Sequence, residues 1–92
     1  MKDPIKVIKA RYESLMNEMN YYELEINLLK ARFVNEDAEG MQWCSDHERW
    51  YKEEYNSRVS LTIELRSLLE ECGYEVLEDW ENEKVILKEV NV

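Results

Sequence analysis

The 92-residue sequence is poor in residues that interrupt regular structure, since it contains only two glycines and one proline. Turns and irregular loops depend on these residues, so their scarcity excludes a fold of many short elements and predicts a few long ones. One histidine and no glycine-rich loop leave nucleophilic and phosphate-transfer chemistry without their usual residues. With 21 acidic residues, chance carboxylate pairs carry no weight. We therefore expect a protein that is not an enzyme.

Basic residues are also scarce, at 12 against 21 acidic residues, and the formal net charge is -9. Binding to nucleic acid depends on cationic side chains that neutralise phosphates, and binding to anionic membranes depends on the same attraction. We therefore expect direct contact with neither. The charge favours instead a protein partner that offers a basic surface.

Cysteine and long apolar runs are the next shortages. Cys44 and Cys72 are the only cysteines, no run approaches the 18 apolar residues of a membrane span, and no apolar leader follows Met1–Pro4. This pattern predicts a cytoplasmic protein with two free thiols and no cofactor. Cys44 and His47 could share a metal, but zinc needs three or four ligands, which only a dimer joining two such pairs could supply. We therefore expect no metal.

The strongest positive signal is a heptad repeat in the first third of the chain. Asp3-Pro4 is a typical helix start, with a capping carboxylate followed by proline in the first turn. From there apolar residues alternate in steps of three and four, and mostly charged residues flank them, which predicts a coiled-coil helix over residues 4–34. The seam residues are Ile5, Ile8, Tyr12, Leu15, Met19, Tyr22, Ile26, Leu29 and Phe33. Met16 belongs to a flanking position, with Lys9, Glu23 and Lys30.

A second helix of similar length follows a polar turn. The connecting turn is predicted over residues 35–41, because the stretch Asn35-Glu36-Asp37-Ala38-Glu39-Gly40 is polar and ends in glycine. A helix is predicted over residues 42–72, with Gly73 as its stop. Two helices joined by a short loop favour an antiparallel hairpin. This pairing would place Glu48, Arg58 and Thr62 in the seam, so the continuity of the second helix stays open.

The last segment changes from a helical to a strand pattern. Residues 74–80 and 84–90 read as two strands of a β-hairpin over residues 74–90. One face of this hairpin, formed by Tyr74, Val76, Trp80, Val85 and Leu87, is expected to cover Leu61 and Leu68 at the base of the helices. The whole chain is predicted as one domain, residues 1–92, of the mainly α class: a long antiparallel two-helix coiled-coil hairpin followed by a small β-hairpin.

The loop end of the first helix is apolar on two sides, and a two-helix hairpin can bury only one of them. A second stripe, with two tryptophans of the other helix, forms an exposed apolar patch of the kind that marks an interaction surface. The patch comprises Tyr21, Leu24, Leu28, Ala31, Trp43 and Trp50. Self-association into a four-helix bundle is the first interpretation, a different protein partner the second, and packing by the chain's own tail the third.

Acidic residues gather in one run that contains no basic residue. Its members are Glu70, Glu71, Glu75, Glu78, Asp79, Glu81 and Glu83. A charge run is usually a solvated face, and the sharper interpretation is an acidic surface that imitates a phosphate backbone and docks on a basic groove. In size and charge the chain resembles the small acidic inhibitors that phages make against host proteins. Lys2, Lys6, Lys9 and Arg11 are expected to lie near this run and to neutralise part of it.

These patterns lead to two hypotheses of function. The first is a cytoplasmic protein-binding module, a homodimeric stoichiometric inhibitor or adaptor whose acidic residues face a basic partner. The alternative is a structural or assembly homodimer, in which the helical hairpin serves as a spacer and a dimerisation device.

Overall fold

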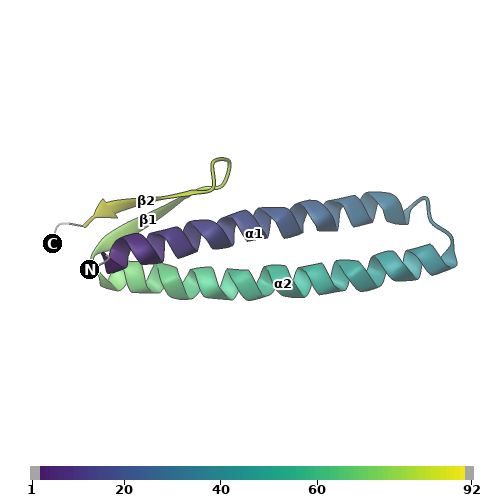
Figure 1. Ribbon diagram of the computed structural model, residues 1–92, viewed down its shortest axis with the longest axis horizontal. Helices are drawn as coiled ribbons and strands as arrows, with labels where there is room; N and C mark the ends of the chain where they lie inside the picture. The colour runs from purple at the N-terminus through teal and green to yellow at the C-terminus, as the bar shows by residue number, and fades with distance from the viewer. Residues whose placement is uncertain (1–2, 91–92) are drawn as a thin grey trace.

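The computed structural model describes residues 3–90, which form two long helices and a two-stranded sheet. Helix α1 (Pro4–Phe33) and helix α2 (Ala38–Glu71) run antiparallel along a body of 59 × 25 × 20 Å. Strands β1 (Tyr74–Asp79) and β2 (Lys84–Glu89) lie against the half of the helical pair that carries the two termini (Figure 1). We call this half the basal end and the loop between the helices the distal end. The predicted fold class is confirmed.

Helix α1 begins where its capping residues predict. The Asp3 carboxylate accepts a hydrogen bond of 3.0 Å from the Ile5 backbone N–H, and Pro4 occupies the first turn. Five residues of the predicted seam are buried, namely Tyr12, Leu15, Met19, Ile26 and Leu29. The ends of the seam are looser, since the two helices stop covering one another there and Phe33 is 36% exposed.

Helix α2 begins at Ala38, earlier than the residue 42 expected from the sequence. Asp37 explains the difference, because its carboxylate caps the helix by accepting a 2.8 Å hydrogen bond from the Gly40 backbone N–H. Gly40 therefore lies in the first helical turn and not in the loop. Beyond Glu71 the chain turns at Gly73, whose φ of 93° lies in the left-handed region that favours glycine.

Helix α2 is continuous over its 34 residues, although Arg58 lies in the seam. The Arg58 guanidinium is paired on both sides: it bonds to Glu54 on its own helix and lies 3.3 Å from Glu18 on α1. It also stacks over the Tyr22 ring at 5.0 Å. A charged side chain is tolerated there because its charge is compensated and its edge reaches water.

The sheet is fastened to α1 by polar side chains. Val85 donates its backbone N–H to Glu13 at 2.8 Å, and the Asn20 amide donates to the Trp80 carbonyl oxygen at 3.1 Å. Asn17 and Asn20 also donate to the Glu83 carboxylate. The strands pair antiparallel in a register that sets Val76 opposite Leu87 and Glu78 opposite Val85.

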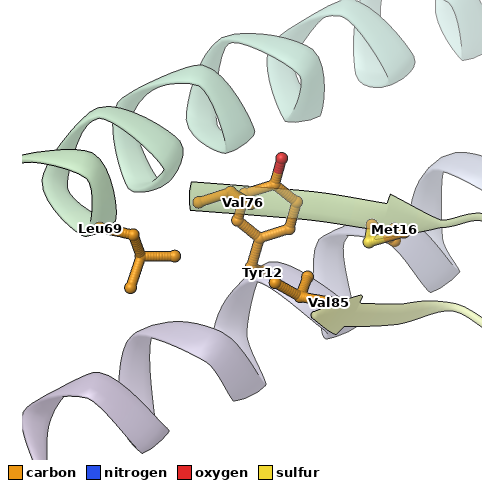
Figure 2. Close-up of a cluster of buried hydrophobic side chains, with 5 residues drawn as sticks. All are labelled: Tyr12, Met16, Leu69, Val76 and Val85. Atoms are coloured by element: carbon orange, nitrogen blue, oxygen red, sulfur yellow. The ribbon is translucent and has the colours of Figure 1, made fainter. Parts of the chain in front are cut away.

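The buried face of the sheet completes a small core at the basal end. Tyr12 and Met16 of α1, Leu69 of α2, and Val76 and Val85 of the sheet converge there (Figure 2). The expectation that the sheet covers Leu61 and Leu68 is wrong, since these residues stay 39% and 46% exposed.

The sheet lies on the other side of the helical pair because Met16 offers an apolar surface there. The heptad pattern predicts a mostly charged flank at the position of Met16, yet Met16 is fully buried. Trp80 lies at the margin of the buried face and is 36% exposed.

Within residues 3–90, neither helix combines the length with the apolar character that a membrane crossing requires.

The turn between the strands carries a carboxylate with an acid-sensitive role. The Asn82 side chain and backbone both donate to Asp79, at 2.9 Å and 3.2 Å, and these bonds lower the pKa of Asp79 below its ordinary value of 3.8. Because the folded form favours the charged carboxylate, the turn's contribution to stability is present above the unfolded pKa. It is lost as the pH falls through the lower folded value.

We therefore expect the Asp79 carboxyl resonance to titrate with a midpoint below 3.8 in NMR spectra of the folded protein. The variant Asn82→Ala removes the side-chain donor and should move this midpoint upward. A midpoint that is the same in both proteins would contradict the assignment.

Candidate functional site

The acidic run divides into two groups in the structure. Glu78, Asp79 and Glu83 are bonded to other groups of the chain, Glu78 beside the basal core and the other two at the turn between the strands. Glu70, Glu71, Glu75 and Glu81 are exposed, and no ion pair to them occurs among residues 3–90. The run is therefore not one continuous binding face. Its outward members lie at the end of α2, on the outer side of β1 and at the turn.

Glu78 has a structural role that its sequence context does not reveal. Its carboxylate bonds to the Arg66 guanidinium and accepts a 2.9 Å hydrogen bond from the Tyr12 hydroxyl. Burial raises the pKa of the Tyr12 hydroxyl above its ordinary value, so Tyr12 stays a neutral donor. These three residues tie α1, α2 and β1 together, and Glu78 is not free to meet a partner.

The basic residues near the N-terminus are expected to neutralise part of the acidic run, but those in the described part of the chain form no ion pair with it. Among residues 3–90, no ion pair joins Lys6, Lys9 or Arg11 to the acidic run. Lys2 lies outside the described residues. On the sheet, Lys88 lies opposite Glu75 in the register, which reduces the local charge at that one position.

The predicted apolar patch is exposed on the helical pair. Tyr21, Leu24 and Leu28 of α1 are 52–56% exposed, and Trp43 and Trp50 of α2 are 43% and 50% exposed. Ala31 is exposed as well. The sheet lies at the basal end, away from most of these residues (Figure 1). Packing by the chain's own tail, the third interpretation of the patch, therefore does not account for it within residues 3–90.

Aromatic contacts show which parts of the patch share one side of the molecule. Tyr22 makes edge contacts with Tyr21 at 5.4 Å and with Trp50 at 6.4 Å between ring centroids. Further along, the Arg32 guanidinium lies 4.7 Å from the centre of the Trp43 ring. Tyr21 and Arg32 of α1 therefore border the same side of the helical pair as the two tryptophans of α2.

The Cys44–His47 pair does not form a ligand set. Cys44 is buried at 1% exposure, whereas the His47 ring stacks on Trp43 at 3.9 Å and donates from Nδ1 to the Trp43 carbonyl oxygen at 2.9 Å. In the described part of the chain, no three His, Cys, Asp or Glu side chains are placed to share a metal ion.

One hollow was not anticipated from the sequence. It has a volume of about 300 Å³ and lies beside Trp80, between the sheet and the helices. Its lining is Tyr12, Met19, Val59, Thr62, Ile63, Arg66, Glu78 and Trp80. The available signal was the apolar pair Val59 and Ile63, one turn apart on α2 and outside the seam.

Comparisons of this chain with protein-family models, with curated proteins and with solved structures find no match.

Proposed function

We propose that this chain is a protein-binding module without catalytic activity, which acts as a cytoplasmic stoichiometric inhibitor or adaptor on a partner with a basic surface. The supporting observation is the set Glu70, Glu71, Glu75 and Glu81, exposed at the basal end with no ion pair among residues 3–90. Unpaired carboxylates on a chain of net charge -9 attract a cationic surface over a distance and orient the encounter. In this role the acidic end occupies a groove that otherwise takes a phosphate backbone, as the phage inhibitors that it resembles in size and charge do.

A second candidate function is favoured by a different observation, the exposed apolar patch. Large aromatic and aliphatic side chains in contact with one another carry most of the energy of protein interfaces. We propose that the chain is a homodimer, and that its long helical pair serves as a spacer or assembly device. The two candidates are compatible, because the exposed carboxylates and the patch are formed by different residues, with Glu70 and Glu71 at the basal end of α2 and Trp43 near its distal end.

The first candidate is tested with a labelled arginine-rich peptide, protamine, by fluorescence anisotropy. Replacing Glu70, Glu71, Glu75 and Glu81 together by glutamine should weaken binding at least ~10-fold. The matched control replaces Glu23, Glu39, Glu53 and Glu64, which are exposed and make no ion pair among residues 3–90. It removes the same charge from other places and should weaken binding less.

Salt gives the second arm of this test. Exposed charges are screened over about 10 Å at 0.1 M ionic strength and about 3 Å at 1 M, so binding through the acidic end should fall steeply with salt. Equal losses in the two quadruple variants would show that only total charge matters. That result would refute a specific acidic binding site.

A further inference from the structure

The apolar surface of α2 extends well beyond the predicted patch. Trp43, Trp50, Leu61 and Leu68 are all between 39% and 50% exposed. Their separations are 7, 11 and 7 residues, each close to a whole number of helical turns, so they form one stripe along α2. We call this set the α2 stripe. Its basal half is open because the sheet packs on the other side of the helical pair.

The spacing of the α2 stripe reads the same in both directions. Its midpoint falls between Tyr55 and Asn56, so an antiparallel copy of α2 would set Trp43 against Leu68 and Trp50 against Leu61, and the reverse. A two-fold interface requires such self-complementarity, since each contact in it occurs twice. From this spacing we infer that the α2 stripe is the interface between two copies of this chain, paired antiparallel about a two-fold axis near residues 55–56.

The middle of the stripe is compatible with this pairing. Near the axis, Glu54 would face Ser57 of the second copy, and the Glu54 carboxylate is already bound to Arg58. Glu54 therefore does not enter the centre of the interface without a cationic partner, which would be costly.

The side of α1 that borders the α2 stripe favours the antiparallel orientation through the sizes of its side chains. Its distal half carries the large residue Leu28, whereas its basal half carries the small residues Ala10 and Ser14 after Val7 in the first turns. Antiparallel copies place large side chains against small ones at both ends, which allows close packing. Parallel copies would crowd the aromatic ends together and leave a gap at the basal ends.

Charge distribution supports the same orientation. The acidic run of residues 70–83 contains seven carboxylates and no basic residue. In a parallel pair the two runs would lie side by side and repel each other. In an antiparallel pair Glu70 and Glu71 of one copy lie roughly 45 Å along the helices from those of the other, beyond the screening length of about 10 Å. The turn that carries Glu83 lies nearer the axis, where Asn17 and Asn20 bond to that carboxylate.

The available area matches a stable dimer. Seven large apolar side chains border this side and are 39–55% exposed: Val7, Tyr21, Leu28, Trp43, Trp50, Leu61 and Leu68. With about 200 Å² for a large side chain in full exposure, burying them removes roughly 700 Å² per copy. Stable specific interfaces bury about 600–1,000 Å² per partner.

The inference goes beyond the second candidate function, because it names the contact surface and its orientation. Its first test is the dimer dissociation constant by light scattering of Leu61→Glu and of its neighbour Ile63→Glu. Ile63 is 59% exposed but lies beside the sheet. Leu61→Glu should raise the constant at least ~100-fold, because the axis places the change in the interface twice, and Ile63→Glu should leave it nearly unchanged. A strictly monomeric parent protein, or equal effects of the two changes, would overturn the inference.

Orientation is measured by pulsed electron paramagnetic resonance between spin labels on Cys72, since Cys72 is exposed and Cys44 is buried. The antiparallel pair predicts about 50 Å between the two labels, from 33 residues of helical rise, whereas a parallel pair predicts about 20 Å or less. A Glu75→Cys label in a Cys72→Ser background, on the outer side of the sheet, should again report a long distance. Short distances at both sites would refute the antiparallel pairing.

Salt separates this inference from the acidic partner site. Two chains of net charge -9 repel, so added salt should strengthen the dimer, whereas it should weaken binding to a basic partner. Dimer formation and binding to a basic partner can therefore be measured separately, and failure of one does not prevent measurement of the other. A dimer that dissociates as salt is raised would contradict an apolar interface.

Discussion

Replacing Leu69 by alanine is expected to lower the free energy of unfolding by about 3–4 kcal/mol. Leu69 of α2 is fully buried in the basal core, where it meets Tyr12, Met16, Val76 and Val85 (Figure 2). Removing its branched end leaves a cavity bordered by both helices and the sheet, which cannot all close in together. For a chain of 92 residues the total free energy of unfolding is about 5–14 kcal/mol, so this loss is a large share of it.

Urea denaturation followed by circular dichroism measures this loss, and Ile63→Ala is the matched control. Ile63 lies on the same helix, is 59% exposed and should cost less than ~1 kcal/mol. Both proteins should be compared at the same chain concentration, because association would add to stability. Similar losses in the two variants would contradict the assignment of the core.

The helical part of the fold could be read from the sequence because its signals are local. The heptad steps in α1, the Asp3-Pro4 start and the Gly73 stop each act through neighbouring residues. The predicted start of α2 is too late because Gly40 is typical of a turn, whereas the Asp37 carboxylate caps the helix. A capping carboxylate decides a helix start more directly than a glycine does.

The position of the sheet could not be read from the sequence. A strand pattern of period two says which residues share a face, and it correctly grouped Val76 with Val85. It does not say which side of a helical pair that face covers, since α2 offers Leu61 and Leu68 on one side and Ile63 on the other. The polar bonds from Glu13, Asn17 and Asn20 that hold the sheet join residues far apart in the sequence.

The candidate surfaces also combine features that the sequence predicts with features that depend on tertiary contacts. The exposed patch followed from a count of apolar faces, because two helices can bury only one stripe each. The acidic run followed from composition, but the engagement of Glu78 with Tyr12 and Arg66 depends on tertiary contacts. The exposure of Leu61 and Leu68 also depends on tertiary contacts, because the sheet packs on the other side of the helical pair.

The second large effect is expected for Met16→Lys, at about 3–5 kcal/mol of lost stability. Met16 is fully buried beneath the sheet, and a lysine there must either bury its charge or displace the strands. The sheet is held to α1 by a few polar bonds besides this apolar contact. Displacing the sheet therefore costs less free energy than burying the lysine charge. The free energy of that displacement is the upper limit of the stability lost.

Hydrogen exchange distinguishes this response from global unfolding. In Met16→Lys the amides of residues 74–89 should exchange much faster, while those in the distal halves of α1 and α2 stay protected. Glu23→Lys is the matched control, because Glu23 occupies the same heptad position one repeat later and is exposed. It lies beyond the sheet and should leave the exchange of residues 74–89 unchanged. Equal loss of amide protection in the two variants would mean that the heptad position, and not contact with the sheet, determines the effect.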